Sequence, residues 1–569
     1  MSVNSEKKDS ALTHFLRCNF RALLLSEGTT QTLRNLRNLS RLCLSLALLA
    51  ILSSPLANTH VTRAAGGKLL WSVEGIGELP TLDPAKASDA QSFLVIDFLY
   101  GRLVKLDGDL KVAPDLASKW DISADGKTYT FSLRDAKFSD GTPITADDVL
   151  YSITYAFDPK VGGANASYYL NNIVGSDDFA NGKAQTISGI SAPDAKTVVL
   201  HINTPSAVFL NQLTFGFRVI SKTQVSADKD WATHPVTSGG FAVKEWKHNQ
   251  SISVVPNPGY WVTPSIDEID FLFIQSSETA YQLYKSGQLD IMGSQQNGVP
   301  IGDLAEVQGL PDFKQAPSFS TRYLAFNNAV PPFDNVNVRR AFALAIDKTV
   351  IADKVLAGAA TAADRIVPPG IPGTDLAITP LKFDAAAAKQ ALVDSGFTAQ
   401  SLPPIRITYG TEGNNEQVLT IMQAMWKSAL GVSVKLDPME VTKFSDTLTA
   451  TYKDPKTSGI QAYYSIWGAD YPDPQNFLSQ QLHSDIGNNN GHWSDAQFDK
   501  LVDQADVILN DDASRFKLYQ QAEQIAIDKV GWLPLFFPKL NALVNPAVGG
   551  IIINGNGIAV PDYSKLKGR

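Results

Sequence analysis

Apolar and polar residues alternate with a period of two in one early stretch of the chain, and the period then changes to one close to 3.6. Tyr129, Phe131 and Leu133 alternate with hydroxyl-bearing residues, which is the pattern of a strand that buries one face. Asp125 and Gly126 supply the turn that joins this strand to an earlier one. These residues therefore predict a β-hairpin.

A helix is expected shortly after the hairpin. Thr145 stands three residues before Asp148, the spacing of a capping box in which each side chain bonds to a backbone N–H group at the helix start. Val149, Ile153 and Phe157 then recur at helical spacing. We therefore expect the helix to begin next to Thr145 and to bury the face that carries these three apolar residues.

The same two signals recur along the rest of the chain. Strands are expected over residues 68–73, 197–202, 251–255, 323–327, 405–409 and 432–436. Helices are expected over residues 92–99, 281–289, 338–347, 385–393, 417–430, 494–507 and 515–529. Ser494 and Gln497 form the capping box that is expected for the sixth of these helices. Strands and helices alternate after residue 316, which indicates a largely parallel sheet.

The N-terminal residues differ from the remainder of the chain. Arg34, Arg37 and Arg41 precede an apolar run over residues 42–52, and small residues follow, as in a secretory signal. The run is 11 residues long, whereas a membrane-spanning helix needs about 20 residues. We therefore expect residues 1–64 to be a signal peptide or N-terminal leader. An uncleaved membrane anchor is the alternative, and the position of any cleavage stays open.

The composition is that of a globular protein with an acidic balance. Of 569 residues, 44% are hydrophobic and 19% are charged, which is enough apolar material for several cores. The formal net charge is −8, and residues 1–64 contribute eight Lys or Arg against three Asp or Glu, so the remainder is more acidic still. This charge argues against nucleic acid as a partner. Cys18 and Cys43 both fall within residues 1–64, which leaves the remainder without disulfides or thiolate metal ligands.

The sequence carries no motif for catalysis or nucleotide binding. Its seven histidines form no HExxH or other compact ligand set, and no metal or cofactor is expected. Gly75 and Gly77 begin a dinucleotide-type pattern, but Pro80 occupies its last glycine position. There is no GxxxxGK[ST] phosphate loop, and Ser238 lacks the GxSxG context of a hydrolase nucleophile. We therefore predict that the chain is not an enzyme.

Four segments resemble the sequence blocks of one family. The segment APDLASKWDISADGKTYTFSLRDAKFSDGTPITADDVLYSITYAFDP, which contains the hairpin and helix described above, is similar to the signature of the bacterial extracellular solute-binding proteins of family 5, the oligopeptide and dipeptide receptors of ABC importers. Three further segments resemble other family blocks in the expected order: PVTSGGFAVKEWKHNQSISVVPNPGYW, YLAFNNAVPPFDNVNVRRAFALAIDK and IWGADYPDPQNFL. The resemblance extends over nearly all of the chain that follows the leader.

This resemblance implies an α/β fold of two lobes with a ligand cleft between them, the large type II class of periplasmic binding proteins with an extra inserted subdomain. The expected boundaries are residues 65–106, 216–315 and 541–569 for the first lobe, 107–215 for the inserted subdomain and 316–540 for the second lobe. Boundaries or hinges are expected at residues 215–219, near Ala316 and near Lys539.

The function that the resemblance implies is transport. An exported receptor at the periplasmic or extracellular face of the membrane would capture oligopeptides by closure of its lobes and deliver them to ABC permease subunits, which work with separate ATPase subunits. The receptor itself is expected to be a monomer. An oligosaccharide receptor, or a receptor for a nickel chelate, haem or glutathione, is the alternative within the same fold. A secreted peptidase or chaperone is the alternative of another class.

The resemblance also assigns a ligand-binding segment. In peptide-binding relatives, an aspartate pairs with the α-ammonium group of the ligand, and Asp470 matches it. Backbone groups of the neighbouring Ile466, Gly468 and Ala469 are expected to bind the peptide main chain, and Trp467 is expected to form a pocket wall. The alternatives are that Asp470 braces its own loop and that Trp467 belongs to the core. Asp473 is expected to be structural, because its flanking prolines suggest the start of a helix.

Five other positions complete the expected site. Dipeptide-specific relatives hold the ligand carboxylate with an arginine at the position that matches Tyr409, unless the match is shifted by three residues. The absence of that arginine argues against strict dipeptide specificity. Ala87 and Ser88, and likewise Ser238 and Gly239, occupy places where the first lobes of relatives approach the ligand.

Overall fold

The computed structural model describes residues 67–569 apart from residues 164, 295, 296 and 487. The predicted leader and both cysteines lie outside these described residues. Among the described residues, we find no helix with the length and apolar character that a membrane crossing requires.

The predicted hairpin forms the centre of a small antiparallel sheet. Strand β5 (Thr128–Leu133) pairs with β4 (Ala117–Ile122) on one side and with β7 (Thr197–His201) on the other, and β6 (Ile190–Asp194) completes the order β4-β5-β7-β6. The side chains of Tyr129, Phe131 and Leu133 are buried, as their alternation predicts.

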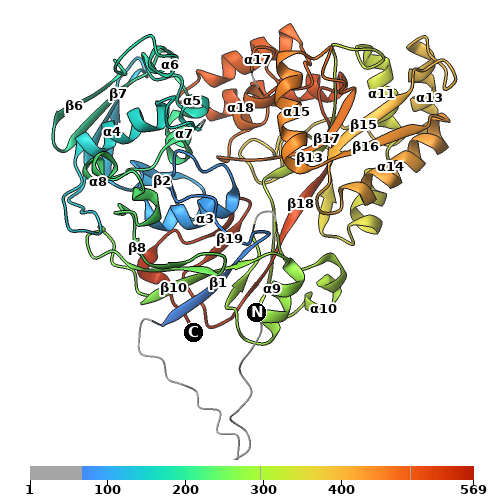
Figure 1. The fold of residues 1–569 in the computed structure, drawn as a ribbon. Coiled ribbons are helices and arrows are strands. Elements are labelled where there is room, and N and C mark those ends of the chain that lie inside the picture. The colour runs from blue at the N-terminus through green and yellow to red at the C-terminus, as the bar shows by residue number, and fades with distance from the viewer. Residues whose placement is uncertain (1–66, 164, 295–296, 487) are drawn as a thin grey trace, which may run out of the picture. The chain divides into compact units, whose positions relative to one another are not determined.

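Helix α4 (Ala146–Phe157) begins where the capping box places it. The Asp148 carboxylate accepts hydrogen bonds from the backbone N–H and the hydroxyl of Thr145, and Val149, Ile153 and Phe157 are buried. Figure 1 shows α4 beside β6 and β7, in the part of the chain that also holds the remaining helices of this region. These are α5 (Asn165–Tyr169), α6 (Ser176–Ala180), α7 (Phe209–Gly216) and α8 (Lys222–Ala227).

The first lobe is built on five strands of a larger sheet. They are β1 (Lys68–Glu74), β8 (Phe241–Lys247), β9 (Ser251–Pro256), β10 (Glu268–Ile274) and β11 (Ile291–Met292). Strand β1 is parallel to β10 and β11, whereas β8 and β9 form an antiparallel hairpin at the sheet edge. Helix α3 (Ala90–Leu99) packs on this sheet, where Phe98 meets the rings of Trp71 and Phe271 at centroid distances of 5.9 and 5.3 Å. Helices α9 (Ser277–Lys285) and α10 (Leu304–Val307) complete this lobe.

The second lobe continues the same sheet with β13 (Ser320–Phe326), β15 (Ile405–Gly410), β16 (Val434–Met439) and β17 (Ala462–Gly468). Strand β15 is parallel to β16 and β17, but β13 is antiparallel to both of its neighbours. The expectation of a largely parallel sheet is therefore wrong, and the sheet is mixed. Local alternation predicts each strand, but the direction of pairing depends on which distant strand lies beside it.

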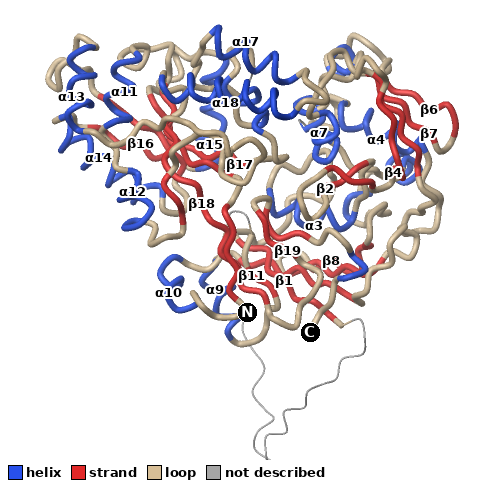
Figure 2. The backbone as a smooth tube through the Cα atoms, turned by 180° about the vertical axis from the view of Figure 1, so that it is seen from behind, coloured by secondary structure: helices blue, strands red, loops and turns tan. Residues whose placement is uncertain are grey.

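One long strand runs through both lobes. Strand β18 (Leu533–Val544) pairs first with β13 and β14 (Ala360–Ala362), and then with β12 (Phe313–Pro317) and β11. Figure 2 shows β18 passing between the two groups of strands. Its partner changes from β14 to β12 between Pro538 and Lys539, which is where the sequence predicts a boundary or hinge. The hinge itself stays a prediction.

Helices cover the second lobe. They are α11 (Val336–Leu344), α12 (Lys348–Val350), α13 (Ala385–Asp394), α14 (Asn415–Leu430), α15 (Val441–Lys453), α16 (Ser479–Leu482), α17 (Ala496–Asp506) and α18 (Asp512–Asp528). Asp384 caps α13 as predicted. Helix α17 is capped by Asp495, whose carboxylate accepts from two backbone N–H groups, so the predicted cap at Ser494 is wrong by one residue.

Two short strand pairs lie outside the main sheets. Strand β2 (Val104–Leu106) pairs with β3 (Val112–Pro114), and β19 (Ile552–Asn554) pairs with β20 (Gly557–Ala559). The β19–β20 hairpin reaches the second lobe, because the backbone N–H of Phe319 donates to the Gly555 carbonyl at 2.8 Å. This hairpin therefore bridges the C-terminal part of the chain and the start of β13.

Candidate ligand-binding site

A cavity of about 570 Å³ lies between elements of the two lobes. Its walls come from the end of β1, helix α3, the region around β2, the loop that follows β17 and the β19–β20 hairpin. The volume is within the range of about 300 to 1,000 Å³ that is typical of small-molecule sites. The cavity therefore has the position and size expected of a cleft for a small solute.

Asp470 lies at this cavity with one carboxylate oxygen already in use. Its Oδ2 accepts a hydrogen bond from the Tyr169 hydroxyl at 2.6 Å and from the Asn476 Nδ2 at 3.3 Å. No lysine, arginine or histidine among residues 67–569, as far as these are described, forms an ion pair with this carboxylate. Burial raises the pKa of Asp470 to about 6, although the two hydrogen bonds act in the opposite direction. An ammonium group that reached this carboxylate would give it a charge-assisted hydrogen bond in place of the water that burial has removed from it.

Tyr169 makes this acid part of a contact between two distant parts of the chain. It is the last residue of α5 in the inserted segment, and 301 positions separate it from Asp470. The neighbouring Tyr168 donates to the Gln480 carbonyl at 3.2 Å and accepts from Gln481 at 3.3 Å. Helix α5 therefore joins the inserted segment to the second lobe directly at the acidic end of the cavity.

Asn476 holds the loop that carries Asp470. Its side chain is fully buried; the Oδ1 atom accepts from the Asp470 backbone N–H at 3.1 Å and from the Trp467 indole N–H at 3.2 Å. The same indole N–H also donates to the Asn476 carbonyl at 2.9 Å. A single buried amide thus fixes both the acid and the aromatic wall, because each depends on it for a hydrogen bond.

Asp473 is structural, as its flanking prolines predict. Its carboxylate caps the short 3₁₀ helix Pro474–Asn476 and pairs with Arg515 of α18 at 2.8 Å. A second Arg515 bond to the other carboxylate oxygen measures 3.0 Å, so the pair is bidentate, and both side chains are buried. This pair anchors the loop to α18 immediately behind the site.

The opposite wall of the cavity carries paired arginine and carboxylate groups together with aromatic rings. The Asp97 carboxylate on α3 accepts from Arg102 and, at 2.8 Å, from Arg218. Burial acts to raise the pKa of Asp97, but the two guanidinium groups outweigh it and hold the pKa below its usual value. Burial and the neighbouring Arg102 lower the pKa of Arg218 to about 10. The rings of Phe93 and Phe215 pack against each other at a centroid distance of 5.0 Å and an interplanar angle of 47° beside these groups.

Glu74 is a second cavity carboxylate without a described cationic partner. Its Oε1 accepts from the Ser72 hydroxyl at 2.8 Å and from the Gly293 backbone N–H at 2.6 Å, while Oε2 accepts from Ser277 at 3.0 Å. Burial raises its pKa, and these hydrogen bonds oppose that change. Each lobe therefore contributes at least one carboxylate to the cavity that has no ion-pair partner among the described residues.

The structure brings most of the predicted site residues together. Ile466, Trp467, Gly468, Ala469, Asp470, Ser88 and Gly239 all line the cavity. Ala87, Ser238 and Tyr409 are buried and do not line it. The Ser238 hydroxyl donates to the Val219 carbonyl and accepts from the Gly101 backbone N–H, and Tyr409 belongs to the core of the second lobe. The ligand roles of all ten residues stay predictions.

The sequence did not predict several residues that line the cavity or support its walls. Asn476 supports the cavity wall from behind, and its position in the IWGADYPDPQNFL segment, two residues after Pro474, was a signal that could have identified it. Glu74, Arg102 and Arg218, which line the cavity, gave no such signal, because only tertiary contacts bring them there. The same holds for Tyr169, which contacts Asp470.

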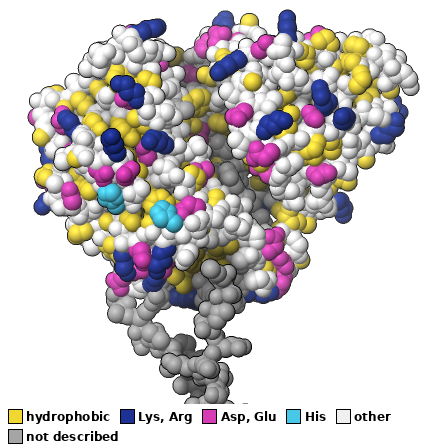
Figure 3. Space-filling view, viewed as in Figure 1, with side chains coloured by type: hydrophobic (Ala, Val, Ile, Leu, Met, Phe, Trp, Pro, Cys, Tyr) yellow, Lys and Arg dark blue, Asp and Glu magenta, His cyan; other side chains and the backbone are white. Residues whose placement is uncertain are grey.

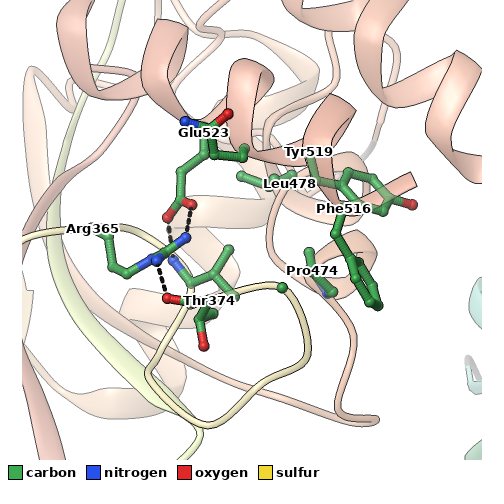
Figure 4. A pocket seen from close by; sticks show the side chains of 10 residues that line it. Arg365, Thr374, Pro474, Leu478, Phe516, Tyr519 and Glu523 are labelled. Atoms are coloured by element: carbon green, nitrogen blue, oxygen red, sulfur yellow. Dashed lines mark hydrogen bonds and ion pairs between the residues drawn. The ribbon is translucent and has the colours of Figure 1, made fainter. Parts of the chain in front are cut away.

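A smaller cavity of about 10 Å³ lies beside α18 (Figure 4). The Glu523 carboxylate accepts from the Arg365 guanidinium at 2.6 Å and from the backbone N–H groups of Ile366 and Val367, both at 2.8 Å. Figure 4 shows Arg365 placed between Glu523 and Thr374. This volume holds at most one water molecule, and the groups around it bind one another, so it is part of the second lobe's framework.

Comparison with known proteins identifies the family of this chain. The family described as bacterial extracellular solute-binding proteins, family 5 Middle, matches residues 111–489. The chain belongs to this family. The match confirms the resemblance read from the four sequence segments, and members of the family are substrate-binding proteins.

Individual relatives extend the similarity over most of the chain. The periplasmic oligopeptide-binding protein OppA of Salmonella typhimurium is 32% identical over 83% of this chain and 88% of its own length. The probable deoxycholate-binding periplasmic protein YgiS of Escherichia coli is 31% identical over the same shares. The structure of the murein tripeptide-binding protein MppA of Escherichia coli has a TM-score of 0.73 at 28% identity, covering 89% of this chain and 99% of that one. These similarities confirm the expected two-lobed α/β fold.

Proposed function

We propose that this chain is an exported receptor of an ABC importer and that it captures oligopeptides without chemistry of its own. The observation that carries the proposal is Asp470, a carboxylate that faces a cavity between two lobes and meets only neutral donors among the described residues. A peptide α-ammonium group supplies the missing positive charge. The names of OppA and MppA, which state that these relatives bind oligopeptides and a murein tripeptide, support the same ligand class.

Closure is the proposed mechanism. A ligand that contacts the Asp470 loop and the α3 wall at once binds the closed arrangement more tightly than an open one, and so shifts the population toward closure. Permease subunits in the membrane then recognise the closed form and receive the ligand, with ATP hydrolysis on separate subunits. This role places the working chain at the periplasmic or extracellular face of the membrane. On the face shown in Figure 3, acidic and basic side chains are interspersed, with no large basic patch of the kind that nucleic acid requires.

A calorimetric panel tests the ligand class. The wild-type protein is titrated with tri-, tetra- and penta-alanine, with the N-acetylated forms of these peptides, with cello-oligosaccharides, with deoxycholate and with a nickel chelate. We expect binding of the free peptides and at least tenfold weaker binding of the acetylated peptides. Equal affinity for both peptide forms contradicts the ammonium role of Asp470. If only the sugars, the bile acid or the chelate binds, that solute and not a peptide is the ligand.

The affinity for peptides is expected to depend on pH. Since an ammonium group binds the ionised carboxylate and the pKa of Asp470 is about 6 in the protein without ligand, affinity should be highest near pH 7 and fall below pH 6. It should also begin to fall near pH 8, where the α-amino group of the peptide loses its proton. The expected loss is about tenfold between pH 7 and pH 5. Titrations of tetra-alanine at pH 5, 6, 7 and 8 measure this dependence. Asp470→Asn is the control and should show no inflection near pH 6, whereas an identical inflection in that variant assigns the titration to another group.

A further inference from the structure

Two polar atoms at the tip of the β19–β20 hairpin have no hydrogen-bond partner in the part of the chain that the structure describes. The Nδ2 of Asn554 and the Oδ1 of Asn556 are both buried from solvent, and neither finds a partner among the described residues. Both asparagines line the cavity that also holds Asp470. Buried polar atoms of native proteins are bonded in the large majority of cases, so two open positions at one turn beside the cavity are available to a ligand once the two amide side chains turn toward it.

The position of this turn ties it to the Asp470 loop. The Gly555 carbonyl accepts from the Phe319 backbone N–H at 2.8 Å, and the Phe319 carbonyl accepts from the Ala469 backbone N–H at 2.7 Å. A Cβ atom on Gly555 would lie 2.2 Å from the Phe319 ring, so this residue must be glycine for the turn to come so close. The turn that carries the two asparagines is therefore linked through the Phe319 backbone to Ala469, the residue that precedes Asp470.

Internal bonds fix the two amide side chains in complementary roles. The Oδ1 of Asn554 accepts from the Asn556 backbone N–H at 3.0 Å, which leaves the Nδ2 of Asn554 as the free group and makes it a donor. The free Oδ1 of Asn556 is an acceptor. One donor and one acceptor, two residues apart, match the C=O and N–H groups of a single residue in an extended chain, because those two groups point to the same side.

We propose that the turn over residues 554–557 binds the main chain of a peptide ligand. This turn lies outside residues 111–489, which match the family. The Asn554 amide donates to the carbonyl, and the Asn556 carbonyl accepts from the N–H, of one residue of an extended peptide in the cavity. This inference rests on the proposed peptide-binding function and deepens it. It assigns affinity to backbone recognition, which is independent of the side chains of the ligand.

The test uses tetra-alanine and three analogues in which an ester oxygen replaces each amide N–H in turn. Asn554→Ala and Asn556→Ala are each expected to weaken tetra-alanine binding by about 3- to 10-fold, the effect of losing one hydrogen bond to a neutral group. One ester analogue should bind wild type more weakly, and Asn556→Ala should weaken that analogue no further. Asn510→Ala removes an exposed asparagine outside the cavity and should leave every affinity unchanged.

The outcomes separate this inference from the proposed function. The main-chain role is wrong, while peptide binding stands, if both cavity variants bind tetra-alanine as tightly as wild type does. The same conclusion follows if each variant loses affinity by the same factor for tetra-alanine and for every ester analogue. If wild type binds neither tetra-alanine nor its analogues, both proposals are overturned. Far-ultraviolet circular dichroism of each variant shows that any loss of affinity is not a loss of folding.

Discussion

Asp470→Asn is expected to weaken the binding of free oligopeptides by about 100-fold or more. The substitution keeps the shape of the side chain and its contacts with Tyr169 and Asn476, but it removes the charge that faces the ligand ammonium. Loss of one member of a buried charge pair costs about 3 to 5 kcal/mol, because the remaining charge has lost its water without gaining a partner. Isothermal titration with tri-, tetra- and penta-alanine measures the change.

Two controls separate charge from shape in this experiment. N-acetylated peptides carry no ammonium, so their weaker binding should change by less than about threefold between wild type and Asp470→Asn. Tyr169→Phe removes the hydrogen bond from α5 but keeps the carboxylate, and it should cost no more than about tenfold. If Asp470→Asn binds free peptides as tightly as wild type, the carboxylate braces its own loop and the peptide assignment has lost its main support.

Arg515→Met is expected to lower the free energy of unfolding by about 3 to 5 kcal/mol. Methionine keeps most of the aliphatic volume, but Asp473 would stay buried without its bidentate partner. Because Asp473 anchors the loop that leads back to Asp470, the variant should also weaken peptide binding. Urea unfolding followed by tryptophan fluorescence measures the stability change.

A surface ion pair provides the matched control for this prediction. Lys222 and Asp147 lie 2.7 Å apart with both side chains exposed, so Lys222→Ala should change the unfolding free energy by less than about 1 kcal/mol. Equal effects of the two substitutions would mean that the buried Asp473–Arg515 pair contributes no more to the free energy of unfolding than an exposed pair does. In that case the loop must be held by Asn476 and its neighbours alone.

Local elements of this fold follow directly from short stretches of sequence. The alternation around Phe131 predicts the buried face of β5, and Thr145 with Asp148 predicts the first turn of α4, because both signals act through neighbours within four residues. The prediction at Ser494 failed because two adjacent residues can both cap a helix, and the side chain of Asp495 reaches the free N–H groups. Strand direction failed for a different reason, since the antiparallel placement of β13 depends on β17 and β18, which lie far along the chain.

The candidate site likewise has parts that local sequence predicts and parts that depend on distant contacts. The sequence by itself determined the breaker-rich segment that carries Trp467, Asp470 and Asp473, and its resemblance to a known family named the acid as the ligand-binding group. Only the tertiary structure decided which groups face that acid. Tyr169 approaches it from 301 positions away, and the turn over residues 554–557 reaches it through the backbone of Phe319. Such contacts depend on how whole lobes pack around a shared sheet, and no local periodicity or spacing encodes that arrangement.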